Sequence, residues 1–92
     1  MTTERPDDSY RTDQYIPFDD VDYYLEIGRN VAYYRNKAGL SQQELAKRAG
    51  LSRSYISHLE SKNVPHKCSL DSLFKICRAL KIEPVKLFLP LP

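Results

Sequence analysis

Two capped helix starts stand close together in this chain, with a glycine between them. Ser41 is followed three residues later by Glu44, which is the pattern of a capping box at the start of a helix. Gly50 ends that short helix, because glycine adopts left-handed backbone at little cost. Ser52 then caps a second helix. The stretch 41–61 therefore predicts two short helices joined by a tight turn.

Apolar residues at helical spacing predict further helices on both sides of this pair. A helix is expected from about Val21, and Gly39 supplies its left-handed stop. After the pair, Ser69 caps a fourth helix, and Pro84 fits the first position of a fifth one over residues 85–89. With no convincing strand in the sequence, we predict an all-α, compact five-helix domain.

Charge divides the chain into two parts. Residues 1–26 carry eight acidic and two basic side chains, a net charge of −6, whereas residues 27–92 carry twelve basic and four acidic ones, a net charge of +8. Residues 1–20 show little periodicity and are predicted to form a flexible acidic tail, with the helical domain over residues 21–92. The basic excess of this domain fits either a polyanionic partner or simple solubility.

The motif as a whole resembles a known family. The resemblance is carried by Gly39-Leu40-Ser41-Gln42-x-Glu44-Leu45-Ala46 and by Ala49-Gly50-Leu51-Ser52-x-Ser54-Tyr55-Ile56-Ser57-x-Leu59-Glu60. It is similar to the Cro/C1-type (xenobiotic-response-element) helix-turn-helix regulators over about residues 24–89. The stretch around residues 53–57 is similar to restriction–modification controller proteins. The resemblance implies a lambda-repressor-like fold and a transcriptional regulator, without catalytic activity or cofactor, that binds double-stranded DNA as a homodimer on a palindromic operator.

The second helix of such a motif lies in the major groove, with its N-terminal residues at the bases. Its polar face is therefore expected to read base edges, and it consists of Arg53, Ser54, Ser57 and His58. Arg53 has the planar fork that donates two parallel hydrogen bonds to guanine. The alternative interpretation of His58 and the serines is a solvated helix face without a function.

Phosphate contacts are expected around this helix, because free amides and the helix dipole attract anions at helix starts. The predicted contacts are Gln42, Gln43, Tyr55, Lys62, Asn63, Lys67 and Ser69. Tyr55 equally fits a half-buried ring packed on the preceding helix, and the lysines fit solvated side chains. The loop after the second helix is about two residues longer than is usual in the family and lacks its glycine, so Asn63 is expected to supply a left-handed turn.

Two further features concern how the domain is held together and how it assembles. The resemblance implies that Arg35 pairs with Glu60, although two separate surface charges are the alternative. The apolar C-terminal end is predicted to form the dimer interface, with Val85 and Phe88 left to the core. The predicted interface residues are Leu87, Leu89 and Leu91.

The sequence also offers alternatives to DNA binding. An antitoxin or another protein-interaction module would use the acidic tail or a tyrosine-rich first helix, which carries Tyr23, Tyr24, Tyr33 and Tyr34. A zinc site would draw on His58, His66, Cys68 and Cys77, but the cysteine spacing does not fit a usual knuckle, and no metal is expected. The absence of an apolar run of membrane length and the two cysteines predict a cytoplasmic protein without a membrane partner.

Overall fold

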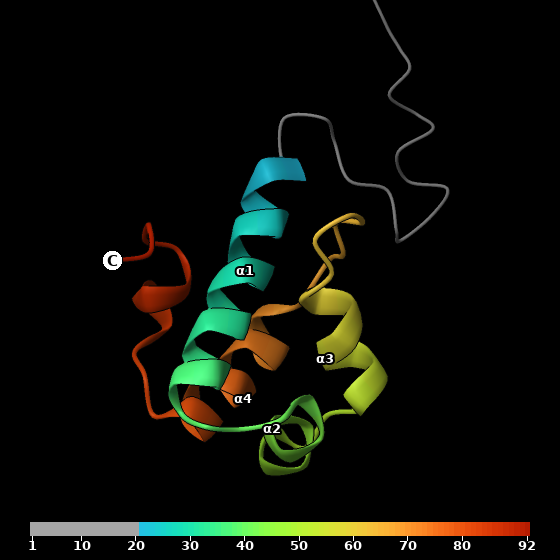
Figure 1. Cartoon of the computed structure of the whole chain (residues 1–92), viewed down its shortest axis with the longest axis vertical. Helices are drawn as coiled ribbons and strands as arrows, with labels where there is room; N and C mark the ends of the chain where they lie inside the picture. Colours follow the sequence, from blue (N-terminus) through green and yellow to red (C-terminus); the bar gives the residue numbers. More distant parts are fainter. Residues whose placement is uncertain (1–20) are drawn as a thin grey trace, which may run out of the picture.

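Four α-helices follow one another through residues 21–92, the part of the chain that the computed structural model describes (Figure 1). They are α1 (Val21–Lys37), α2 (Gln42–Ala49), α3 (Arg53–Leu59) and α4 (Leu70–Leu80). The described part of the chain contains no strand, which confirms the all-α prediction. The predicted tail over residues 1–20 lies outside the described residues.

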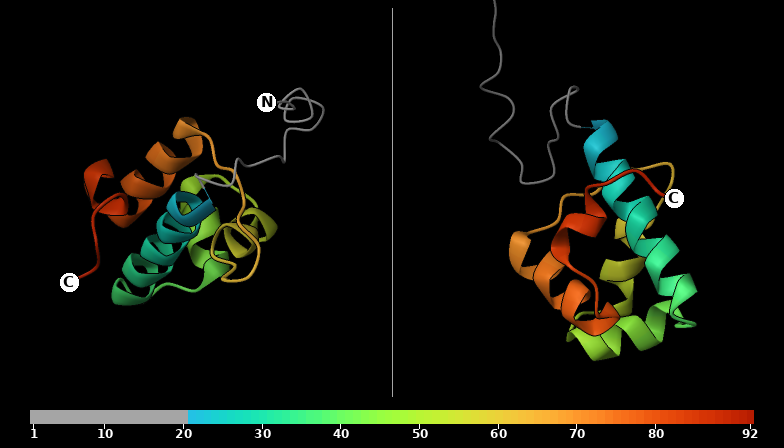
Figure 2. Two further views of the ribbon diagram at one scale, coloured as in Figure 1. Left: turned by 90° about the horizontal axis from the view of Figure 1, so that it is seen from above. Right: turned by 90° about the vertical axis from the view of Figure 1, so that its left-hand side faces the viewer.

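The helices surround a small apolar core. α1 stands upright in the middle of Figure 1, with α3 on its right, and α2 packs against both α3 and α4 below it. The C-terminal segment, which follows α4 over residues 81–92, packs against α1 and α4 on the side away from α3, as the two further views of Figure 2 make clear. Each of five successive segments contributes one fully buried aliphatic side chain, namely Val31, Leu45, Ile56, Ile76 and Leu87.

The helix ends agree with the expected glycines but not with the expected asparagine. Gly39 and Gly50 both have positive φ angles, of 75° and 71°. Asn63 does not supply a left-handed turn, so that prediction is wrong: Lys81, with φ 58°, is the non-glycine residue of residues 21–92 that adopts this conformation. The physical reason is that α3 ends on Glu60 in right-handed backbone, with φ −84° and ψ −2°.

The predicted fifth α-helix is instead a short 3-10 helix, η3 (Pro84–Leu87). Its hydrogen bonds span three residues: the amide of Lys86 donates to the carbonyl of Glu83, and that of Phe88 to the carbonyl of Val85, both over 2.9 Å. Pro90 stops the helix from continuing, since it has no N–H to donate and disfavours helical backbone at the residue before it. Within residues 21–92, the five-helix prediction therefore becomes four α-helices and one 3-10 turn.

The packing of the C-terminal segment corrects one predicted interface residue. Leu87 is 0% exposed, so it belongs to the core and the prediction that it contacts a partner molecule is wrong. Asn30, buried in α1, fixes this arrangement: its amide Nδ2 donates to the carbonyls of Leu87 and Leu89, both over 2.9 Å. Val85 and Phe88, which were left to the core, are instead 50% and 52% exposed.

Candidate nucleic-acid interface

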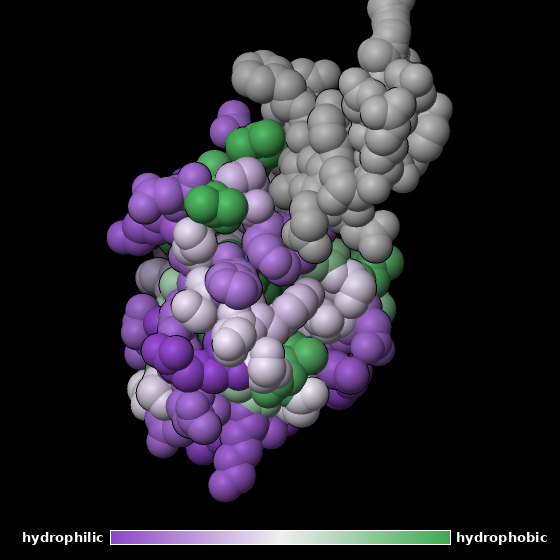
Figure 3. Space-filling view, turned by 90° about the vertical axis from the view of Figure 1, so that its right-hand side faces the viewer, coloured by the Kyte–Doolittle hydropathy of each residue, from purple (hydrophilic) through white to green (hydrophobic). Residues whose placement is uncertain are grey.

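α3 begins with a side-chain cap and has two unlike faces. The hydroxyl of Ser52 accepts a hydrogen bond from the amide of Tyr55 over 3.0 Å, which satisfies one of the free amides of the first turn. Ile56 and Leu59 bury the inner face. The outer face carries the predicted base-reading residues: Arg53, Ser54 and His58 are exposed and Ser57 is half-buried. This side of the molecule, turned to the viewer in Figure 3, mixes hydrophilic and neutral residues with small apolar patches.

α2 starts with the complete capping box that the sequence predicts. The amide of Glu44 donates to the Ser41 hydroxyl over 3.0 Å, and the amide of Ser41 donates to the Glu44 carboxylate over 2.8 Å. Hydrogen bonding of the Glu44 carboxylate to Ser41, chiefly to its backbone amide and secondly to its side chain, lowers the pKa of Glu44 below its ordinary value. Gln43 in the first turn is exposed beside this cap.

A polar cluster joins α1, α2 and the end of α3. Arg35 donates to both carboxylate oxygens of Glu60, from Nε over 2.7 Å and from Nη2 over 2.9 Å, so the two side chains form the pair that the resemblance implies. The Arg35 side chain is 12% exposed and that of Glu60 only 5%. The bond to Glu60 raises the pKa of Arg35 despite its burial. Arg35 also donates to the carbonyl of Leu40 over 2.7 Å, so this cation is bonded on three sides.

Gln42 belongs to the same cluster, a role that its sequence position did not indicate. Its amide Nε2 donates to Oε1 of Glu60 over 3.0 Å, so the residue predicted as a phosphate contact holds the end of α3 against the start of α2. A glutamine directly after a helix cap is a common surface residue, and its spacing carries no signal for this bond. One carboxylate at the end of α3 is thus bonded to both α1 and α2.

The close approach of α1 to the end of α3 requires a glycine. A Cβ atom placed on Gly28 would overlap the backbone oxygen of Leu59 and also crowd its carbonyl carbon. Gly28 is buried in the middle of α1, where glycine otherwise costs about 1 kcal/mol relative to alanine. The contact therefore fixes how near α3 lies to α1, and only a residue without a side chain permits it.

The loop and the start of α4 place the remaining predicted phosphate contacts in different environments. Lys62 and Asn63 are exposed, whereas Lys67 is half-buried. Ser69 caps α4: its hydroxyl accepts from the amide of Ser72 over 3.1 Å and donates to the Ser72 hydroxyl over 3.0 Å. The proton of Ser69 is therefore already used within the protein.

The packing of Tyr55 fits the interpretation of a half-buried ring better than that of an exposed phosphate contact. Its side chain is half-buried and packs against the core, and its ring meets His66 edge-on with centroids 6.1 Å apart.

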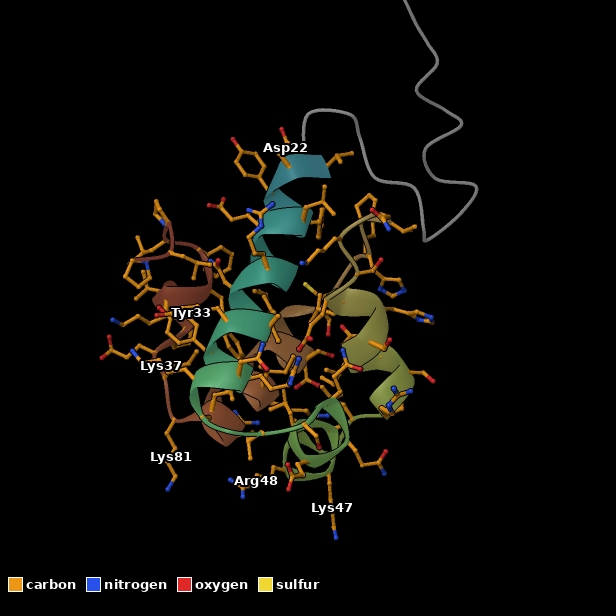
Figure 4. All side chains as sticks on the ribbon, in the orientation of Figure 1. Asp22, Tyr33, Lys37, Lys47, Arg48 and Lys81 are labelled. Carbon is orange, nitrogen blue, oxygen red and sulfur yellow. The ribbon has the colours of Figure 1, made fainter. Side chains whose placement is uncertain are left out.

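The last turn of α2 adds two basic residues that were not singled out in the sequence: Lys47 and Arg48 are exposed and extend away from the domain (Figure 4). Their position in the last turn also suits the negative end of the helix dipole.

No group of three or more His, Cys, Asp or Glu side chains within residues 21–92 comes together to hold a metal ion. Burial raises the pKa of the Cys68 thiol to about 11 and also raises that of Cys77, which disfavours the thiolate that zinc requires. Within the same residues, no helix is both long enough and apolar enough to cross a membrane.

The two surfaces proposed for protein contacts are both partly exposed. At the C-terminal end, Leu89 is 47% exposed and Leu91 is half-buried. On α1, Tyr23 is exposed, and the rings of Tyr33 and Tyr34 pack edge-on with centroids 5.0 Å apart. The apolar surface at the C-terminal end is therefore larger than the predicted leucines alone, since Val85 and Phe88 add to it.

The chain is similar to known proteins in both sequence and fold. The family model for helix-turn-helix domains called HTH_3 matches residues 31–87. A hypothetical transcription factor from Neisseria meningitidis serogroup B is 33% identical over 72 residues, which make up 78% of this chain and 66% of that protein. The chain spans 66%, 40% and 50% of the lengths of three curated relatives, the last two being the regulators SlrR and SinR of Bacillus subtilis.

Solved structures give the same result. The restriction-modification controller protein C.AhdI from Aeromonas hydrophila is 37% identical, with a TM-score of 0.66 over 71% of this chain and 96% of that one. SinR, the master regulator for biofilm formation, solved in complex with DNA, is 34% identical, with a TM-score of 0.62 over 66% of this chain and 95% of that one. The capped α2–α3 pair and these matches together show that the chain belongs to the Cro/C1-type helix-turn-helix family (HTH_3) of transcriptional regulators.

Proposed function

We propose that this protein binds double-stranded DNA sequence-specifically through α3, as a homodimer on a palindromic operator in the cytoplasm, and regulates transcription from that site. The observation that carries the proposal is the outer face of α3, where Arg53 stands exposed in the first turn of a serine-capped helix. A helix fits the major groove, where each base pair presents a distinct pattern of donors and acceptors. The related SinR was solved in complex with DNA, which supports the same partner here.

The roles of the side chains follow from their environments. We assign base reading to the α3 residues Arg53, Ser54, Ser57 and His58, and phosphate contacts to exposed donors that flank them, chiefly Gln43, Lys62 and Asn63. Tyr55, Lys67 and Ser69 are less accessible or already bonded, and Gln42 acts by positioning α3. The net charge of +8 over residues 27–92 supports a polyanionic partner.

Selection of bound sequences from random duplex DNA tests the proposal. The wild-type protein is expected to enrich a palindrome whose half-sites are about 34 Å apart, one turn of DNA, because a two-fold dimer presents two α3 helices. Its affinity should fall steeply with salt, since each neutralised phosphate releases about 0.9 counterion on duplex DNA. An unenriched pool, or an affinity that stays flat between low and moderate salt, would contradict the proposal.

Arg53→Ala tests the proposed base contact. It is expected to cost about 1–3 kcal/mol on the selected site and to relax the preference at one base pair per half-site. Binding to scrambled duplex should fall much less, because a base contact carries sequence information and a phosphate contact does not. Arg78→Ala, which removes the same charge from the exposed surface of α4, is the control. Equal losses on both duplexes for Arg53→Ala would mean that Arg53 only positions the protein.

Leu89→Glu tests the proposed dimer. Leu89, Val85 and Phe88 form an exposed apolar patch beside the buried Leu87, and a charge in the patch should give a folded monomer that binds the operator poorly. Sedimentation at several concentrations measures the effect. Val64→Glu charges an exposed apolar residue in the loop between α3 and α4 and should leave the dimer intact. A wild-type protein that stays monomeric on DNA would contradict the dimer.

A further inference from the structure

The loop between α3 and α4 folds back onto α3 through one histidine. The ring of His66 stacks on that of His58, with centroids 5.4 Å apart and planes inclined by 27°. Its edge-on contact with Tyr55 lies on the same helix, three residues before His58, so both partners lie on one side of α3. His66 therefore lies between two aromatic rings of the helix that carries the proposed base-reading face.

His66 is itself held from the other side. Its Nδ1 lies 3.0 Å from the backbone oxygen of Lys67. Because a carbonyl oxygen only accepts, Nδ1 carries the proton in this bond. The His66 ring is half-buried, whereas the His58 ring is exposed. The half-buried ring of His66 thus restricts the movement of the exposed ring of His58.

The space beside the pair is open. His58, Ser61, Val64 and His66 surround a hollow of about 330 Å³ on the surface. Stacking occupies one face of the His58 ring, while the ring remains exposed to solvent. A base edge can therefore approach His58 while His66 stays in place behind it.

We propose that His66 is a specificity-determining residue of the DNA interface: it holds the His58 imidazole in one orientation on α3, so that His58 reads a single base edge. The proposal rests on the proposed function. An exposed histidine samples several staggered rotamers, and each directs its ring nitrogens differently. A ring held before binding loses less conformational entropy in the complex and presents its donor or acceptor in one direction. His66 acts through His58 and is a positioning residue.

The first measurement is made on the free full-length protein. In proton NMR spectra the His58 ring protons should show a ring-current shift caused by His66. His66→Ala should remove the shift, whereas His66→Phe, which retains a ring able to stack, should keep most of it. Arg78→Ala, on the exposed surface of α4 and outside the stack, should leave it unchanged. A His58 shift that is the same in His66→Ala and wild type would overturn the proposal.

The second measurement compares affinities for the duplex selected by the wild-type protein and for its single-base variants. His66→Ala should reduce the preference at the base pair that His58→Ala also affects, by about three- to tenfold per half-site. The double variant should lose no more than His58→Ala alone, because the two residues act through one contact. His66→Phe should keep most of the preference, and Arg78→Ala, far from the stack on α4, should keep all of it.

The outcomes separate this proposal from the proposed function. A wild-type protein with no sequence preference would overturn the proposed function and the role of His66 with it. A wild-type preference that His66→Ala leaves intact, or weakens equally at every base pair, would overturn the role of His66 alone. Thermal unfolding of each variant completes the comparison, because a merely structural role for His66 would lower the melting temperature without changing the relative preference among bases.

Discussion

Two regions of the molecule are held to the same helix by polar side chains, but by different chemistry. Arg35 of α1 holds the α2–α3 pair through a charged, two-pronged bond to Glu60. Asn30, five residues earlier in α1, holds the C-terminal segment through two bonds to backbone carbonyls. The first region carries the proposed DNA contacts, and the second carries the proposed dimer patch.

The comparison shows which kind of contact a sequence reveals. The Arg35–Glu60 pair belongs to a set of spaced residues that resembles a family, so it was expected before the structure was known. The Asn30 bonds have no such pattern, because their acceptors are backbone oxygens that every residue possesses. Asn30 Oδ1 is also buried without a hydrogen-bond partner, so this second junction is less completely satisfied.

The largest expected effect concerns how closely α3 approaches α1. Gly28→Ala should destabilise the fold by about 3 kcal/mol or more, because the new methyl group collides with the Leu59 carbonyl and cannot relax without moving a helix. The sign is informative, since the same change in an unobstructed helix stabilises by up to about 1 kcal/mol. Gly50→Ala, whose Cβ meets open space, is the control for backbone strain alone and should cost less. Urea unfolding measures both, and a Gly28→Ala protein as stable as wild type would contradict the tight junction.

Glu60→Ala should cost about 2–3 kcal/mol, because it leaves the mostly buried Arg35 without its partner. It also frees Gln42, so α2 and α3 should move relative to one another and DNA affinity should fall more than stability alone explains. Asp71→Ala removes the exposed pair with Lys75 and should cost about 0.5 kcal/mol or less. Equal losses of stability in the two variants would show that the Arg35–Glu60 pair does not organise this junction.

Asn30→Ala should cost about 2 kcal/mol, since it leaves two carbonyls of the C-terminal segment without their donor. The effect should be local: hydrogen exchange at the bonded amides of Lys86 and Phe88 should speed up, while the amides of α3 keep their protection. Asn63→Ala, which truncates an exposed asparagine in the loop between α3 and α4, should change little. If Asn30→Ala loosened α3 as much as the C-terminal segment, the two regions would not be separately held.

The smallest effect is a pH dependence at the start of α2. Glu44 has a lowered pKa in the folded protein, so its contribution is present above the unfolded pKa, about 4.3, and is lost as the pH falls through the lower folded value. Lower protection of the Ser41 and Glu44 amides below about pH 4, measured relative to the exchange of an unfolded peptide at the same pH, should reveal the loss. Glu44→Gln keeps the capping geometry without the charge and should show no such change. Unchanged protection of these amides in acid would show that the charged carboxylate is not needed at this cap.

Errors in the sequence-based predictions concentrate at the C-terminal end. Leu87 and Leu89 are alike in sequence, yet one is buried in the core and the other is half exposed. Val85 and Phe88 were assigned to the core and lie outside it. A helix of α geometry would have turned different side chains inward than the 3-10 turn does, because the two advance by different angles per residue. Because an α-helix was predicted where a 3-10 helix forms, the residues predicted to be buried and those predicted to be exposed were exchanged.

The predictions for the α2–α3 pair succeeded because their signals are local. Ser41, Glu44, Gly50 and Ser52 each act on backbone groups within a few residues, so their spacing alone specifies where α2 and α3 begin and where α2 ends. The polar outer face of α3 follows from helical periodicity in the same way. Whether these exposed residues contact DNA stays a prediction, to be tested with the selected duplex.

The sequence by itself determined the all-helical class, the helix caps and the two faces of α3, because these depend on interactions within three or four residues. Only the tertiary structure decided that Gln42 joins the Arg35–Glu60 pair, that His66 stacks on His58, and that Asn30 bonds to carbonyls 57 and 59 residues further along the chain. Such partners are chosen by the packing of whole helices. No local preference in the sequence distinguishes one distant carbonyl, carboxylate or ring from another.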